Sequence, residues 1–262
     1  MKTLIRYLKI WWMLSINSFS MVFAQRGAMA FLLIGKVLRF TFFFGFLYFL
    51  VSGVNKLVGY SVNQVILFFL TFYIVDVISQ FFFREVYRFR PKIVSGDFDL
   101  SLIKPINPLF QSLAGGADVI DLVTIPPLLI ATIYFAALLA PDFWHSLLYI
   151  FLVFNGLVIS TAFHIAVLAM GIITLEIDHT IMIYRDLTAL GRFPVDIYKQ
   201  PLQGILTYLI PVGIMVTLPG KALMGLVSPT GVLLSFAIGA VFLLISLRFW
   251  NFALTKYTSA SS

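Results

Sequence analysis

Three carboxylates could do chemistry in this sequence because they fall within or beside its most apolar stretches: Asp76, Asp118 and Asp121. Asp76 lies four residues before Gln80, and Asp118 lies three residues before Asp121, so each pair shares one face of a helix. Ionisable groups at membrane depth are costly and often mark ion, proton or substrate pathways. Asp76 is open to that role, but a structural polar cluster is the favoured interpretation. For Asp118 and Asp121 we expect pairing with nearby Arg or Lys side chains.

Other catalytic chemistry is not indicated. Gly35-Lys36 and Gly220-Lys221 lack the earlier glycine and the Ser/Thr of a phosphate-binding loop. Zinc-protease and nucleophile-elbow motifs do not occur. There is no cysteine, and the three histidines fall in different predicted layers, so we expect no metal site, with His164 a hydrogen-bonded structural residue. We therefore expect that this chain is not an enzyme and binds no cofactor.

The elements that must position these residues are membrane helices. The chain has 61% hydrophobic and 11% charged residues, whereas a soluble domain has about 25% charged residues. Its 262 residues can hold about six spans of roughly 20 residues each. We predict an all-α integral membrane protein, a single transmembrane domain over residues 1–262. The net charge of +7 is spread over loops, which indicates topology determinants rather than nucleic-acid binding.

Apolar segments predict six spans. These cover residues 28–51, 61–83, 109–139, 147–175, 202–218 and 231–250. Residues 1–27 are predicted to form an interfacial helix, because Leu4, Leu8, Trp11 and Trp12 recur at helical spacing and Trp favours the headgroup layer. Residues 219–230 are too short to cross and too apolar for an ordinary loop, which predicts an external re-entrant segment. Pro126-Pro127 is expected to kink the third span.

The distribution of basic residues predicts the topology. Residues 84–108 are the longest polar interruption and, being rich in Lys and Arg, are predicted to be cytoplasmic. Residues 176–201 are predicted as a second cytoplasmic loop, and residues 52–60 as an external turn. This arrangement puts 14 of the 18 Lys and Arg inside, against Lys56 and Lys221 outside, with both termini cytoplasmic. Lys36 and Arg39 fall in the first span and are expected to snorkel toward the cytoplasm.

Three stretches of the sequence resemble a known family. SGDFDLSLIKPINPLFQ (residues 95–111) is similar to the G-x-[FL]-D-x-x-L-x-[KR]-P stretch of a bacterial branch of type-2 ABC export permeases. GRFPVDIY (residues 191–198) and LIPVGIMVTLPGKALMG (residues 209–225) resemble later stretches of that branch. The resemblance covers nearly the whole chain. It implies a permease subunit in the bacterial inner membrane, surrounded by lipid and paired with an identical or different permease.

The resemblance also implies that two copies of a separate ATPase bind ATP and Mg and dock on residues 84–108, the coupling loop. Asp97 and Asp99 suit the positive start of a short helix there. Phe98, Leu100, Leu102 and Ile103 are expected to supply an apolar contact surface, and the arginines to pair with acidic residues of the ATPase. The predicted coupling residues are Arg84, Arg88, Arg90, Asp97, Phe98, Asp99, Leu100, Lys104 and Pro105. Alternatively, these charges only set topology and bind anionic headgroups.

The resemblance implies a transport pathway lined by the second and fifth spans. The candidate lining residues are Phe68, Thr71, Phe72, Asp76, Thr207 and Met215. An aromatic, weakly charged lining suits a lipid-linked or amphipathic cargo better than a small ion. Two alternatives stay open. One is an ATP-independent channel or secondary transporter that uses Asp76, Asp118 and Asp121, and the other is a membrane scaffold without transport activity.

Overall fold

Helices joined by short turns make up nearly all of the computed structural model, which describes residues 2–54 and 57–258. Within these residues the only extended pairing is an isolated bridge between Leu57 and Tyr60. Five helices are long and apolar enough to cross a membrane, and one bent pair would make a sixth if it were a single span. The prediction of an all-α, multi-pass membrane protein is confirmed.

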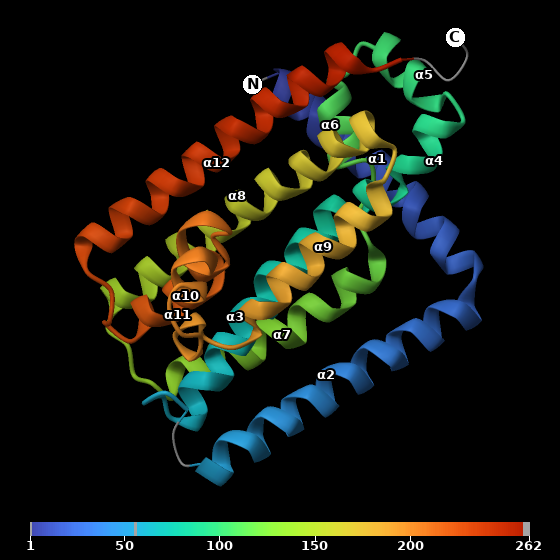
Figure 1. Cartoon of the computed structure of the whole chain (residues 1–262). Helices are drawn as coiled ribbons and strands as arrows, with labels where there is room; N and C mark the ends of the chain where they lie inside the picture. The colour runs from blue at the N-terminus through green and yellow to red at the C-terminus, as the bar shows by residue number, and fades with distance from the viewer. Residues whose placement is uncertain (1, 55–56, 259–262) are drawn as a thin grey trace.

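The five long helices form the body of the molecule (Figure 1). They are α2 (Arg26–Val54), α3 (Val62–Phe83), α7 (Val119–Ala137), α8 (Phe143–Thr174) and α12 (Pro229–Lys256). α8 packs along α12, and α3 packs against both α7 and α8. α3 and α8 are therefore the buried centre, while α2 exposes most of its apolar side chains.

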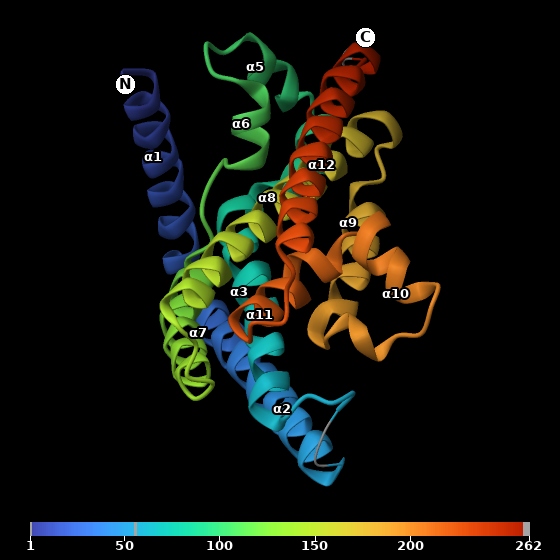
Figure 2. The same cartoon turned by 90° about the vertical axis from the view of Figure 1, so that its left-hand side faces the viewer.

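Helix α1 (Lys2–Ala24) runs across the direction of α2, α8 and α12 in Figure 1. The Arg6 guanidinium donates to the Pro105 carbonyl oxygen at 2.7 Å, and the Tyr7 and Phe110 rings meet edge-on at 4.8 Å. Both termini and the central charged segment lie at one end of the molecule (Figure 2). This end is called the loop end below. The interfacial placement of residues 1–27 stays a prediction, as does the external turn, whose Lys56 lies outside the described residues.

The predicted third span is divided. A short helix α6 (Pro108–Leu113) ends before Gly115, and α7 begins only at Val119. A Cβ on Gly115 would lie 2.6 Å from both the Gln111 carbonyl oxygen and the Glu85 side chain, so the chain turns where only glycine fits. The single helix predicted over residues 109–139 is therefore wrong. α7 itself continues through Pro126 and Pro127 without a break.

Residues 176–201 differ most from prediction. Helix α9 (Ile177–Ala189) begins at the loop end, where Asp178 pairs with Arg90 at 3.3 Å. It packs against α8, and the turn η2 (Leu190–Arg192) that follows packs against α3. A second turn, η3 (Val195–Ile197), reaches the opposite end, where the Tyr60 hydroxyl donates to Asp196 at 2.9 Å. The segment joins the two ends of the bundle and begins with a 13-residue helix, whereas a loop was predicted; its cytoplasmic placement stays a prediction.

The predicted fifth span folds back on itself. It consists of α10 (Leu202–Gly204), the π-helical turns η4 (Ile205–Leu209) and η5 (Gly213–Thr217), and α11 (Leu218–Leu223), with a bend of 76° at Pro211. Gln203 and Lys221, at its two ends, donate to the same Asp196 carboxylate oxygen at 3.2 and 2.7 Å. The two ends of residues 202–223 therefore reach the same carboxylate, and this bent segment is called the hairpin below. Residues 219–230 are divided between the end of α11, a turn and the start of α12, and the external re-entrant segment predicted for them stays a prediction.

Glycine 156 lets this hairpin approach the centre of α8. A Cβ there would lie 2.6 Å from the Met215 carbonyl oxygen, a backbone atom that cannot move aside. We expect Gly156→Val to destabilise the protein by about 1–3 kcal/mol, as overpacking does in other cores. Gly35→Val in α2 is the matched control, because nothing lies within 4 Å of its Cβ position. Thermal unfolding in detergent measures both, and equal melting temperatures would contradict the packing argument.

Candidate functional site

The central charged segment is a compact helical unit at the loop end. It contains the turn η1 (Arg84–Arg88) and the helices α4 (Phe89–Val94) and α5 (Asp97–Ile103). Gly96, at φ 79°, takes the left-handed conformation that separates α4 from α5. Asp97 accepts a hydrogen bond from the Ser95 hydroxyl at 2.7 Å, and both Asp97 and Asp99 lie in the first turn of α5. The predicted short helix with an acidic start is confirmed.

Phe98 anchors α5 to the rest of the chain. Its ring is fully buried and lies 5.0 Å from Phe89, 6.3 Å from Trp250 and 5.1 Å from Tyr257. Burial, and then the neighbouring Asp99 carboxylate, raise the pKa of Tyr257 to about 12. The expectation that Phe98 belongs to an exposed contact surface is therefore wrong.

The other apolar residues of α5 remain at the surface. Ile103 is 80% exposed and Leu100 is 53% exposed, and Leu102 is also exposed. Exposed apolar side chains beside Lys104 form a small surface that is free within this chain. The carbonyl of Pro105 is held by Arg6, so the end of the unit is tied to α1.

The arginines of this unit already have partners within the chain. Arg84 pairs with Asp118 at 3.2 Å, and Arg90 pairs with Asp178 at 3.3 Å. Arg88 and Lys92 both face Glu85, Arg88 at 3.9 Å. The pairing expected for Asp118 is thus confirmed. These ion pairs hold the unit against α7 and α9, which leaves the arginines less available to an outside partner than the sequence implied.

A cavity of about 270 Å³ with several charged groups in its wall lies between α2, α3, α7, α9 and η2. Its walls carry four basic side chains and one carboxylate. These are Lys36, Arg39, Arg185, Arg192 and Asp76. Gln80 donates to Asp76 at 2.9 Å, so the two residues that share a face of α3 bind each other. The remaining wall is mainly apolar and aromatic.

Lys36 behaves differently from its predicted role at this cavity. Lys36 forms an ion pair with Asp121, a residue only 1% exposed, so Lys36 faces protein and does not snorkel. The pairing expected for Asp121 is confirmed. His164 lies outside the cavity, and its Nδ1 hydrogen bonds to the Ser160 carbonyl oxygen at 2.8 Å, as expected of a structural residue.

Of the predicted pathway residues, only Phe72 and Asp76 line the cavity. Phe68 is buried against Gly220, Thr71 hydrogen bonds to Tyr149 at 3.1 Å, and Met215 is buried beside Gly156. Thr207 donates to the Gln203 carbonyl oxygen within the hairpin. These four residues are packed within the chain and do not border the cavity.

Sequence reasoning missed Arg185 and Arg192 because it placed both in a loop. A signal was present. They lie seven residues apart, which is close to two helical turns, in a segment whose apolar residues also recur at helical spacing. An amphipathic helix with a charged face can cross a membrane when that face lines a cavity.

These features define a multi-pass membrane protein with a charged cavity between its helices and a charged helical unit at one end. Residues 37–261 match the family model described as "ABC-2 family transporter protein". The chain therefore belongs to the ABC-2 transporter family and is a transmembrane permease of the type-2 ABC class, as the resemblance implied. No curated protein and no solved structure gives a significant match.

Proposed function

We propose that this chain is the permease subunit of an ATP-driven exporter in a bacterial cytoplasmic membrane. Two permease chains, identical or different, form the pathway, and two copies of a separate ATPase bind ATP and Mg. The proposal is supported by the family, which implies an ABC ATPase partner. No phosphate-binding loop occurs in these 262 residues, and the proposal therefore places ATP hydrolysis on a separate chain.

The observation that carries the proposal is that α5 is exposed on one side and packed against the membrane helices on the other. Ile103 and Leu100 are exposed on one side, while Phe98 on the other side is buried against Trp250 of α12. Arg90 links the same unit to α9 through Asp178. A force applied to the exposed side of α5 would therefore move α9 and α12 together, because packed interfaces shift as units. That is the mechanical requirement for a permease driven by a separate ATPase.

We further propose six spans formed by α2, α3, α7, α8, α9 and α12, with both termini and α5 cytoplasmic. α9 and η2 contain 16 residues, about 26 Å at helical rises. This nearly matches a hydrocarbon core of about 30 Å. The hairpin of residues 202–223 then enters the membrane from the outside, and α1 lies along the cytoplasmic surface. The ion-driven alternative has less support, since Asp118 and Asp121 are both engaged in ion pairs.

Changing Ile103 to Asp tests the docking surface. We expect recovery of the ATPase with the tagged permease in nanodiscs to fall at least tenfold, because a charge replaces an apolar contact on α5. Val58→Asp is the control: Val58 is also exposed, but it lies in the turn at the opposite end and should retain the ATPase. Recovery is measured by pull-down and by the ATP hydrolysis that accompanies it. Equal recovery in both variants, or a permease that carries ions down a gradient with no ATPase bound, would contradict the proposal.

A further inference from the structure

The cavity carries more positive charge than the chain neutralises. Lys36 is paired with Asp121, and Asp76 is the only carboxylate in the wall. Among the described residues, Arg39, Arg185 and Arg192 have no carboxylate within ion-pair distance. Three guanidinium groups therefore face one carboxylate, which leaves a net charge of about +2. Unpaired charge at membrane depth is costly and usually serves a ligand.

Arg192 is the most constrained of the three arginines. Its guanidinium lies over the rings of Phe43 and Phe72, at 5.3 and 5.7 Å from their centroids. Its buried Nε has no hydrogen-bond acceptor among the described residues. Aromatic faces hold the fork in place but do not accept its in-plane N–H groups. The geometry leaves those donors for an acceptor that the chain does not supply.

The other two arginines extend this positive surface toward the opening of the cavity. Arg185 of α9 lies about 12 Å before Arg192 of η2 along the chain. Both line the cavity, as does Arg39 from α2. Both Arg39 and Arg185 are exposed, so a ligand can reach them from the surface of the chain. A guanidinium donates two parallel hydrogen bonds to a phosphate or carboxylate. Three guanidinium groups in the wall of one cavity favour an anion over a neutral or cationic ligand.

The rest of the wall favours an alkyl chain. Phe40, Phe72, Pro127 and Leu128 line the cavity beside the charged groups. Ligand pockets usually hold about 300–1,000 Å³, so a cavity of about 270 Å³ suits a headgroup and the start of a chain. The remainder of the chain would extend through the opening.

We propose that this cavity binds the anionic headgroup, phosphate or carboxylate, of an amphiphile. Arg192 holds the headgroup in the interior, while Arg185 and Arg39 complete its neutralisation. The Asp76 carboxylate, held by Gln80, lies beside the bound anion and limits the site to one headgroup. The occupant is either a bilayer lipid or the transported cargo. The binding step does not depend on transport, but identifying the ligand as cargo rests on the export function proposed above.

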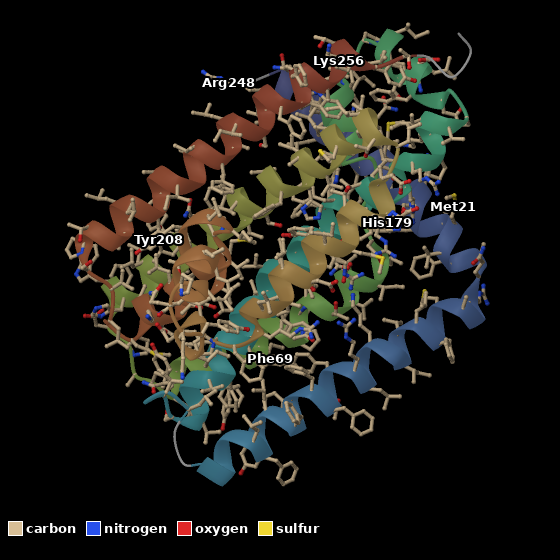
Figure 3. The ribbon with its side chains drawn as sticks, viewed as in Figure 1. Met21, Phe69, His179, Tyr208, Arg248 and Lys256 are labelled. Atoms are coloured by element: carbon tan, nitrogen blue, oxygen red, sulfur yellow. The ribbon has the colours of Figure 1, made fainter. Side chains whose placement is uncertain are left out.

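Calorimetric titration of the full chain in phosphatidylcholine nanodiscs tests binding, with empty nanodiscs subtracted. We expect dodecyl phosphate to bind at least tenfold more tightly than dodecyltrimethylammonium, which has the same chain and a positive headgroup. The triple variant Arg39→Gln/Arg185→Gln/Arg192→Gln is expected to lose at least tenfold in affinity for dodecyl phosphate. Arg248→Gln is the matched control, because Arg248 projects from α12 away from the cavity (Figure 3).

Two results would overturn the proposal. One is equal affinity of the triple variant and the native chain for dodecyl phosphate. The other is tighter binding of dodecyltrimethylammonium than of dodecyl phosphate, if Asp76→Asn abolishes the binding of the ammonium ligand. The comparison of ligands on the native chain decides the question even if the triple variant fails to fold. Native mass spectrometry of the chain purified from bacterial membranes separates the sources. Retention of an anionic phospholipid by the native chain and Arg248→Gln, but not by the triple variant, identifies a bilayer lipid. Titratable binding without retained phospholipid identifies a free amphiphile.

The same variants distinguish this site from the coupling surface. A triple variant that loses dodecyl phosphate but still recovers the ATPase confirms the site and leaves the export function intact. A native chain that binds dodecyl phosphate but recovers no ATPase confirms the site and contradicts the export function.

Discussion

A cysteine introduced at Lys199 is expected to react with a membrane-impermeant maleimide added outside cells, and a cysteine at His179 is expected to react only in inside-out vesicles. Both residues are exposed. His179 lies in the first turn of α9 (Figure 3), and Lys199 follows the turns after α9. The chain contains no cysteine, so each variant carries a single thiol. Because the proposed α9 span would separate the two sites, we expect labelling rates from the two sides to differ by more than tenfold.

Ser95→Cys and Val58→Cys calibrate this labelling. Ser95 is exposed beside α5 and should follow His179, whereas Val58 is exposed in the turn before α3 and should follow Lys199. If Lys199→Cys reacts from the same side as Ser95→Cys, α9 does not cross the membrane. Residues 176–201 would then be cytoplasmic, as the charge distribution predicted, and the hairpin would have to be the fifth span.

The spans proposed above differ from those predicted by hydropathy for a physical reason. Hydropathy measures the cost of moving a segment into lipid, so it rejects α9, whose 13 residues include Asp178, Arg185 and Asp186. It accepts residues 202–218, which are apolar but bend at Pro211 and return to Asp196. Arg185 is tolerated because it borders a cavity and not the lipid alone. Which face of a helix meets a cavity depends on neighbours that a single sequence does not reveal.

The class of protein and the extent of the charged unit were predictable because they depend on composition and on local sequence. The short helix over residues 97–103 follows from its acidic start after Gly96. The burial of Phe98 was not predictable, since its partners Trp250 and Tyr257 lie about 150 residues further along the chain. The apolar residues of DFDLSLI are spread around the helix, so their spacing does not single out Phe98 as the buried one.

Removing the Lys36 ammonium is expected to be among the most damaging single changes to stability. Lys36→Met leaves Asp121, which is 1% exposed, as a buried carboxylate with no counter-ion. Breaking a buried ion pair in this way costs about 3–5 kcal/mol. Asp121→Asn should cost less, because Lys36 is about one-third exposed and its long stem lets the ammonium reach the cytoplasmic surface. Unfolding of the purified protein in mixed detergent measures both free energies.

The double variant Lys36→Met/Asp121→Leu separates the value of the pair from the cost of breaking it. Apolar residues of similar volume often replace a buried pair without loss of stability, so we expect the double variant to be more stable than Lys36→Met by at least 2 kcal/mol. If each single variant loses little stability and the two losses add up to that of the double variant, the pair contributes nothing to stability. If the double variant is as stable as the native chain, the pair is dispensable for folding, and its place beside the cavity must serve binding or movement of α2 against α7.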